Sequence, residues 1–444
     1  MGKCVASYAM RGAPFAVVMV SSWAAAALAL AMATSANAQE SQLEGDRAAT
    51  KAHAMDPVAA LSLGRALRRA GHPVEALAEL RRGVGVSAAK LDVLVSLHWE
   101  IARVQMDRHD FIQTLTTCQV LGKLPGAAAE GHACNAAADL LQQRSTAALE
   151  ETAAALKRDP RCYEATLAEG RAQEFALDVA KSETAYRAAI ALRPDAQEPR
   201  VGLGRLLWRS GRRDDGVAEL RRAVQVDPNG PEGLYELGQA VGPSAESVGL
   251  LDHATRERAT FTDAWLALGT QLLAAGRVAD ARKAAVAAER GDPSSVAPKI
   301  LVGKVALAEG HADEAVRAGE AALKIVANSA AAKLLVADGN ASKGEIDLAL
   351  EAYQAAWGLD HSDPTPLVHA TEACHAAGRE TSAKAFGLKA AQEFPKWGPA
   401  WAALGDALLA QGEKAAAKDA FQKALTGDGP VARDAVQKKL SALP

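Results

Sequence analysis

The chain has 444 residues and a formal net charge of −3, with acidic and basic residues interspersed. Hydrophobic residues make up 49% of it and aromatic residues only 4%, so its apolar part is mostly alanine. The charge balance excludes the strongly basic face that binds nucleic acid. The scarcity of β-branched and aromatic runs argues against a sheet. The composition therefore predicts an all-α fold with small side chains at the helix contacts.

The first 38 residues have the three-part layout of a secretory signal peptide. Lys3 and Arg11 supply positive charge, residues 15–33 carry none, and small residues follow up to Ala38. We predict cleavage after Ala38 and a mature protein in a bacterial periplasm or outside the cell. The alternative is a membrane anchor, because residues 15–33 are nearly long enough to span a bilayer.

A polar stretch at 39–56 is interpreted as a linker, and an internal repeat begins after it. Glycine, alanine and proline recur every 34 residues from position 57 onward. The N-terminal units occupy 57–261, with one unit extended by four residues (91–128) and one shortened (231–261). Self-similarity at such a period is typical of solenoid proteins.

Five regular units follow without a gap at 262–431, and the chain ends in a short helical pattern. Glycine recurs at the fifteenth position of each regular unit, as Gly276, Gly310, Gly344, Gly378 and Gly412. Residues 432–444 have a polar face and are predicted to form a helix that caps the stack.

Each unit is predicted to contain two amphipathic helices. Apolar residues at positions 4, 7 and 11 of the first helix and 20, 24 and 27 of the second lie on one face each. Small residues at positions 8, 20 and 27 allow the two helix axes to approach closely. Glycine at position 15 suits a turn with positive φ. Proline near position 32 ends the second helix.

The pattern resembles the tetratricopeptide repeat family. The residues that carry the resemblance are Trp265, Leu268, Gly269, Ala281 and Pro293, together with Trp401, Leu404, Gly405, Ala417, Phe421 and Ala424. It implies a solenoid of antiparallel helix pairs forming a superhelix. It also implies a non-catalytic scaffold that binds a peptide or protein in the concave groove lined by the first helices. Such envelope proteins typically organise secretion, assembly or cell-division complexes.

Positions 2, 5, 9 and 12 of the first helices are expected to face that groove. In the second half of the chain they include Asp338, Glu372 and Asp406. Arginine and aromatic residues anchor interfaces, so we predict a protein partner, with an acidic group, in the first half. The residues chosen there are Arg65, Arg68, Trp99, Arg171, Arg205, Trp208 and Tyr235. The alternative is that they are ordinary solvated residues.

Acidic residues at position 2, such as Glu164 and Glu198, are interpreted differently. Carboxylates in the first turn of a helix offset its dipole. The sequence contains no recognisable catalytic motif, so we expect no catalytic residue, no cofactor and no metal. An enzyme with an unrecognised site remains the alternative from another class.

Two cysteines lie at similar distances on either side of a loop between antiparallel helices. Cys118 is in the second helix of one unit and Cys134 in the first helix of the next. In an exported protein this spacing suggests a disulfide. Two buried free thiols are an equal alternative, and a metal site with His109 and His132 is a third.

Overall fold

The computed structural model describes residues 43–443 except residues 49 and 87–89. The predicted signal peptide, its cleavage site and the candidate anchor at 15–33 lie outside the described residues. In the part that is described, no helix is both long enough and apolar enough to cross a membrane.

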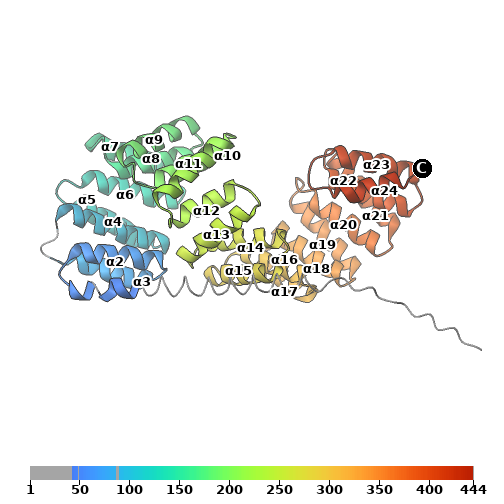
Figure 1. Ribbon diagram of the computed structural model, residues 1–444, viewed down its shortest axis with the longest axis horizontal. Helices are drawn as coiled ribbons and strands as arrows, with labels where there is room; N and C mark the ends of the chain where they lie inside the picture. Colours follow the sequence, from blue (N-terminus) through green and yellow to red (C-terminus); the bar gives the residue numbers. More distant parts are fainter. Residues whose placement is uncertain (1–42, 49, 87–89, 444) are drawn as a thin grey trace, which may run out of the picture. The chain divides into compact units, whose positions relative to one another are not determined.

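The described chain is a succession of antiparallel helix pairs (Figure 1). No strand occurs among the described residues, apart from an isolated bridge between Trp397 and Asp428. The predicted all-α fold of helix pairs is therefore confirmed. In chain order the pairs are α2 (Pro57–Arg69) and α3 (Pro73–Val84), α4 (Leu91–Asp107) and α5 (Phe111–Gly122), α6 (Ala128–Leu141) and α7 (Ser145–Arg158), α8 (Tyr163–Phe175) and α9 (Val179–Leu192), α10 (Glu198–Arg209) and α11 (Arg213–Val226), α12 (Pro231–Ala240) and α13 (Ala245–Glu257), α14 (Thr262–Ala274) and α15 (Val278–Gly291), α16 (Val296–Ala308) and α17 (Ala312–Ile325), α18 (Ala330–Ser342) and α19 (Ile346–Leu359), α20 (Thr365–Ala376) and α21 (Glu380–Glu393), and α22 (Gly398–Ala410) and α23 (Lys414–Thr426).

The irregular repeats differ from the others in the length of the first helix. Helix α4 has 17 residues and α12 has 10, whereas α8 has 13. An α-helix has 3.6 residues per turn, so adding four residues or removing three changes its length by about one turn. The apolar stripe of the helix therefore keeps facing the core.

The turn inside each repeat needs a residue with positive φ. Glycine supplies it in most repeats, as at Gly276 with φ 71°. Three successive repeats use other residues there, namely His109 (φ 55°), Gln143 (φ 57°) and Leu177 (φ 60°). The backbone geometry of the turn is thus retained even where the glycine is lost.

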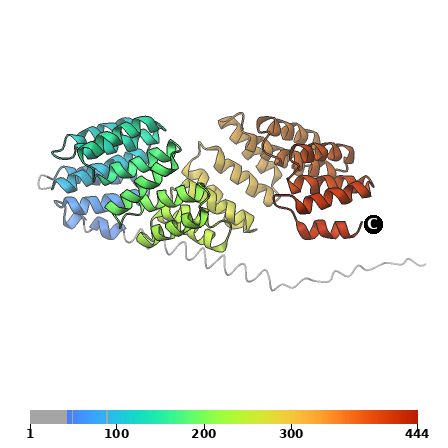
Figure 2. The same ribbon diagram turned by 90° about the horizontal axis from the view of Figure 1, so that it is seen from above.

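The first helices form one layer and the second helices another. First helices of successive repeats contact one another, for example α6 with α8 and α20 with α22. Second helices contact the first helices on either side of them but make no comparable contact with each other. Because the first helices lie closer together, their layer is the concave side of the stack. Figure 2 shows the paired helices stacked side by side.

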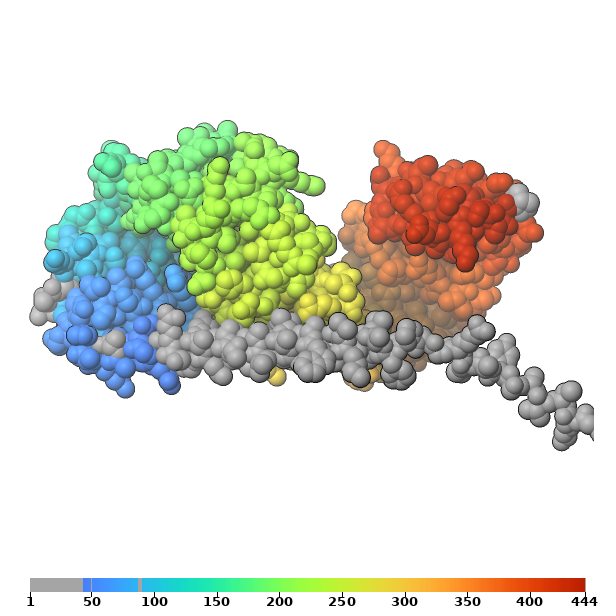
Figure 3. All heavy atoms as spheres, in the orientation of Figure 1, coloured from blue at the N-terminus to red at the C-terminus, as the bar shows by residue number. Residues whose placement is uncertain are grey.

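The chain divides into two compact units. The N-terminal unit extends to Val241 and includes His253–Ala259, and the C-terminal unit contains Gly242–Asp252 and Thr260 onward. Figure 3 shows successive repeats of the N-terminal unit packed against one another on one face.

Part of the segment expected to be a linker is folded. Most of residues 43–52 are helical, and Leu43 is only 3% exposed because it packs with Leu61 and Leu67 of the first repeat. Arg47 also donates a hydrogen bond to Glu75 at 2.8 Å. The expectation of a linker over all of 39–56 is corrected here, since the first helix pair has no preceding repeat to cover its apolar face.

The C-terminal end is covered by α24 (Arg433–Ser441). Its single buried residue is Val436, which packs with Phe421 and Leu408 of the last pair. The rest of α24 is polar, as a helix at the end of a stack requires.

The N-terminal unit brings distant repeats together. Arg69, at the end of α2, lies 3.8 Å from Asp227, which follows α11. In a solenoid, repeats normally contact only their neighbours. The stack of this unit therefore curves so far that its first repeat contacts the fifth.

Candidate functional site

The concave face of the N-terminal unit is organised around a buried carboxylate, Glu100 on α4. Its side chain is 2% exposed and lies 3.0 Å from Arg65, 3.4 Å from Arg68 and 2.9 Å from Arg103. Burial alone would raise the pKa of Glu100, but the three guanidinium groups outweigh burial and hold that pKa below its usual range. Two of the predicted groove arginines, Arg65 and Arg68, are thus neutralised by their own chain.

Arg205 on α10 is held in a second network of this kind. It donates to Glu174 on α8 at 3.0 and 2.8 Å and lies 3.3 Å from Glu236 on α12. The Tyr186 hydroxyl also donates to Glu174, at 2.8 Å. Burial would raise the pKa of Glu174, but the hydrogen bonds from Arg205 and Tyr186 lower it overall. Arg205 therefore connects three successive repeats.

The aromatic residues predicted for the groove are more deeply packed than expected. Trp99 is only 8% exposed and belongs to the core cluster that contains Cys134 and Cys162, so its expected exposure is corrected. Because α4 is one turn longer than the other first helices, the groove position expected for Trp99 is taken by Arg103, which lies one turn further along the helix. Trp208 is half-buried and donates its indole N–H to the Ala240 carbonyl at 3.2 Å.

Tyr235 of α12 is half-buried, and its hydroxyl accepts a hydrogen bond from Gln239 at 3.3 Å. This contact joins two residues one turn apart on the same helix. Tyr235 thus remains at the groove surface.

Arg171 on α8 differs from the other predicted arginines. It is exposed, and it makes no ion pair or hydrogen bond with any residue that the structure describes. The neighbouring Tyr163 hydroxyl is buried and has no hydrogen-bond partner among the described residues. Burial raises the pKa of Tyr163, Glu198 raises it further, and Arg193 and Arg171 lower it. Arg171 and Glu198 are therefore both within electrostatic range of this hydroxyl.

Among acids at position 2, some bind arginines from the same repeat. Glu164 pairs with Arg193 at 2.8 Å, and Glu232 pairs with Arg258. Arg193 also lies over the Tyr163 ring, 4.1 Å from its centroid, as a cation–π contact requires. Glu198 on α10 is exposed and has no ion pair with any described residue.

The last three repeats of the C-terminal unit carry an acidic residue at the ninth position, namely Asp338, Glu372 and Asp406. Asp338 on α18 accepts a hydrogen bond from the Tyr353 hydroxyl at 2.7 Å and lies 2.8 Å from His369 on α20. Burial would lower the pKa of His369, but the contact with Asp338 raises it overall. Asp406 is bound by Lys439 of α24 at 2.6 Å.

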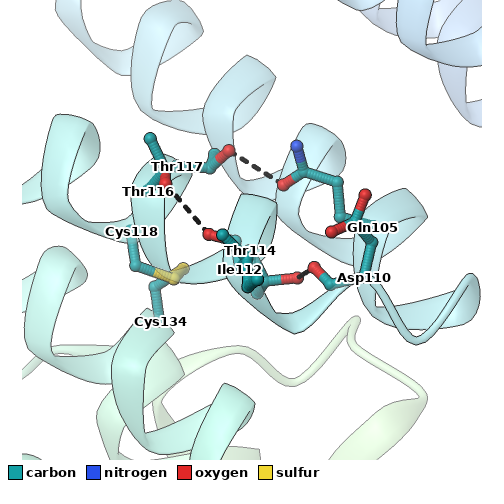
Figure 4. The surroundings of a disulfide bond; sticks show 8 residues. All are labelled: Gln105, Asp110, Ile112, Thr114, Thr116, Thr117, Cys118 and Cys134. Atoms are coloured by element: carbon teal, nitrogen blue, oxygen red, sulfur yellow. Dashed lines mark hydrogen bonds between the residues drawn. A yellow bond between two sulfur atoms is a disulfide. The ribbon is translucent and has the colours of Figure 1, made fainter.

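Cys118 of α5 and Cys134 of α6 form a disulfide (Figure 4). Their Cα atoms are 5.3 Å apart, within the range that a disulfide requires. The two helices can approach because Gly122 faces Gly131. A Cβ atom added at Gly131 would lie only 2.4 Å from the Cα atom of Gly122. His132, considered above as a metal ligand, instead lies 2.6 Å from Glu151.

The remaining described cysteines, Cys162 and Cys374, are buried free thiols. Burial raises the pKa of the Cys162 thiol to about 12, and it also raises the pKa of Cys374. Both thiols are therefore protonated at neutral pH and are poor nucleophiles, because the thiolate is the reactive form.

One group of side chains in the described part has the ligand types and spacing of a metal site. It consists of Glu309, His311 and Glu314. The guanidinium of Arg282 already lies between the two carboxylates, where it pairs with Glu309 and lies 2.5 Å from Glu314. A cation there would have to displace Arg282, so this group is an ion-pair network.

The sequence pattern did not single out Glu100 or Glu174, which hold the arginines in place. Glu174 is at the twelfth position of its repeat, which was expected to face the groove. Glu174 and Arg205 are 31 residues apart, which is three fewer than one repeat. The same separation joins Arg205 to Glu236, so this spacing is a signal from which the ion pairs could have been predicted. Glu100 lies in the extended repeat, where counting from the start of the unit misplaces the groove residues.

Two segments of the chain match models of a known protein family. Family models described as tetratricopeptide repeat match residues 201–241 and residues 398–426. A search of curated proteins gives no match.

Among solved structures, yeast Tom70 is similar at 12% identity and a TM-score of 0.45, over 87% of this chain and 95% of that one. A tetratricopeptide repeat protein from Parabacteroides merdae is 15% identical, with a TM-score of 0.42 over 63% of this chain and 97% of its own. PilW, a type IV pilus biogenesis factor, is 20% identical, with a TM-score of 0.41 over 46% and 97%.

The fold defines the class of protein as an all-α solenoid built from helix pairs. More particularly, the two matched segments are tetratricopeptide repeats. Proteins with these repeats generally mediate protein–protein interactions and are typically not catalytic.

Proposed function

We propose that this protein is a non-catalytic scaffold of the bacterial cell envelope that binds a peptide or protein partner along its concave face. The observation that carries the proposal is the layer of first helices in the N-terminal unit. It presents charged and aromatic side chains on a surface that stays open to solvent, such as Arg171 and Trp208. Arginine and tryptophan are the residues that anchor protein interfaces most often.

The location outside the cytoplasm is supported by two independent features. Residues 1–38 have the pattern of a cleaved signal peptide. The Cys118–Cys134 disulfide is the second, because such bonds persist in oxidising compartments and are rare in the cytosol.

A second form of the proposal is an adaptor held at the inner membrane by residues 15–33, serving a secretion, assembly or cell-division complex. N-terminal sequencing of the protein from envelope fractions separates the two forms. Gln39 as the first residue supports the released protein, and an intact N-terminus in the membrane fraction supports the adaptor.

The binding proposal is tested by site-specific photocrosslinking in cells. A photoreactive benzoylphenylalanine replaces Arg171 on the concave face, and a matched variant carries it at Lys181 of the outer helix α9. We expect a discrete crosslinked adduct from position 171 and none from position 181. Equal crosslinking at both positions would contradict the assignment of the concave face.

Mass spectrometry of the unreduced protein tests the disulfide directly. The expected result is a linked peptide pair that contains residues 118 and 134. Two separately alkylated peptides from the exported protein would contradict the oxidising location.

A further inference from the structure

We infer that a pocket at the N-terminal end of the repeat stack binds a small aliphatic carboxylate. The pocket has a volume of about 410 Å³, and its walls come from the helical segment at 43–52 and the turn after it, from α2 and from α3. Volumes of this order are typical of small-molecule sites. The inference does not depend on the partner proposed for the concave face.

The floor of the pocket is apolar. Leu63 and Leu67 of α2 line it and are almost completely buried, at 3% and 1% exposure. Ala54 and Ala78 also line it and are exposed, so only two methyl groups narrow its entrance. A short hydrocarbon chain that lies on this floor moves its own apolar surface out of water, which is favourable.

The charges around the pocket leave one positive charge in excess. The basic lining residues are Arg47, Lys51 and Arg82, and the acidic ones are Glu75 and Glu79. Arg47 pairs with Glu75, and Arg82 pairs with Glu79, each at 2.8 Å. Lys51 is exposed and has no ion pair or hydrogen bond with any residue that the structure describes. A single negative charge on a ligand would therefore balance the pocket.

Arg82 supplies a hydrogen-bond donor that the protein itself leaves unused. Its Nη1 donates to the Ala54 carbonyl, and its Nε donates to Glu79 at 2.8 Å. Its Nη2 is buried and has no hydrogen-bond partner within the described part of the chain. A buried donor without a partner is costly, and bonds between guanidinium and carboxylate groups are among the strong ones. A ligand carboxylate in the pocket would satisfy this donor.

The positions of Lys51 and Arg82 favour a monoanion with an apolar chain. Ala54, whose carbonyl binds Arg82, follows Lys51 by only three residues. The two oxygens of one carboxylate can therefore accept from Arg82 and Lys51 together, while the attached chain covers Leu63 and Leu67. Inorganic phosphate has no apolar part for this floor, and an aliphatic amine would add to the positive charge.

The test is a titration of the purified protein with hexanoate, followed by saturation-transfer difference NMR of the ligand. Hexylammonium and hexanol are the matched ligands, because they carry the same hydrocarbon chain with a positive charge and with no charge. We expect hexanoate to bind about tenfold more tightly than either of them, since only hexanoate forms charge-assisted bonds with Arg82 and Lys51.

Substitutions locate the site. Lys51→Gln removes a charge that has no bond within the described protein, and it should weaken hexanoate binding about fivefold. Ala78→Leu fills the pocket without changing its charge and should abolish binding. Arg82→Gln should weaken binding more than Lys51→Gln, but it also removes the bond to Ala54. Arg81→Gln is the control, because Arg81 is exposed beside Arg82 and does not line the pocket.

Equal melting temperatures will verify that the Lys51, Ala78 and Arg81 variants are folded. Equal affinity for hexanoate and hexanol would overturn the recognition of a carboxylate. Binding that is unchanged in both Lys51→Gln and Ala78→Leu, or weakened equally by Lys51→Gln and Arg81→Gln, would overturn the assignment to this pocket. None of these results bears on the concave face, which photocrosslinking at position 171 tests separately.

Discussion

Glu100 shows at the level of single residues how the concave face is built. A carboxylate that is 2% exposed stays ionised because three arginines surround it. The same arginines look from the sequence like free anchors for a partner. Their true role is mainly internal, since each of them satisfies a charge that the fold has buried.

Replacing Glu100 by Gln is expected to lower the free energy of unfolding by about 2 kcal/mol. Removing one partner of a buried ion pair leaves the other charge uncompensated, and the partial exposure of the arginines reduces the loss. Urea unfolding followed by circular dichroism measures it. The control is Asp347→Asn, which breaks an exposed pair with Arg379 and should leave the unfolding midpoint unchanged.

Leu177 is a second residue whose backbone conformation leads to a testable prediction. It adopts φ 60° and is 85% exposed, at a turn position where most repeats have glycine. Leu177→Gly should raise the free energy of unfolding by about 0.5–1 kcal/mol, because glycine adopts this conformation without a steric penalty. Leu177→Ala should have no such effect, and Gly276→Ala should be destabilising. A lower urea midpoint for Leu177→Gly would contradict this explanation.

At the level of helices, adjacent repeats are joined by specific bonds as well as by alanine contacts. The Cys118–Cys134 disulfide joins α5 to α6 across a sequence separation of 16 residues. Its removal in a Cys118→Ala, Cys134→Ala variant is expected to lower the free energy of unfolding by about 3 kcal/mol. Urea unfolding under non-reducing conditions checks this. An unchanged midpoint would show that the bond does not constrain the unfolded chain.

His369 joins α20 to Asp338 of α18 in the preceding repeat. Because the folded protein raises the pKa of His369, protonation stabilises the fold. This contribution is complete below the unfolded pKa of about 6.5 and is lost as the pH rises through the raised folded value. We expect the wild type to lose stability over that range and His369→Gln to lose less. His361→Gln is the control, and a pH dependence identical in all three proteins would contradict the assignment.

At the level of the whole molecule, the N-terminal unit curves until its first and fifth repeats meet. The N-terminal unit returns on itself where Arg69 approaches Asp227, and these two partly exposed side chains form an ion pair at 3.8 Å. Exposed pairs contribute little and are screened by salt. The concave face of this unit is therefore expected to open as ionic strength rises.

Spin labels at Arg81→Cys and Gln225→Cys can follow this opening, because both positions are exposed and lie on α3 and α11. Arg69→Glu should lengthen the measured distance at low salt. Exchanging the charges in Arg69→Asp with Asp227→Arg should restore it. A distance that is the same in all variants and salt concentrations would show that the repeat stack alone sets the closure.

Much of the architecture was predictable from the sequence because it is local. The spacing of small and apolar residues within 34 positions decides which face of each helix is buried, and glycine or its substitutes decide the turns. Trp99 was misplaced because a helical turn inserted into α4 shifts the numbering within that repeat. The helical segment around Leu43 was missed because a capping helix carries few apolar residues.

The sequence by itself determined the helix pairs, their number and most of the positions that line the concave face. Only the tertiary structure decided which charges on that face are free. Ion-pair partners such as Glu100 and Arg65, or Glu174 and Arg205, lie about one repeat apart and meet only after the repeats have stacked. Periodicity places a side chain on a face, but the pairing of charges depends on distances across helices. That Arg171 has no ion pair among the described residues could therefore be seen only in the folded molecule.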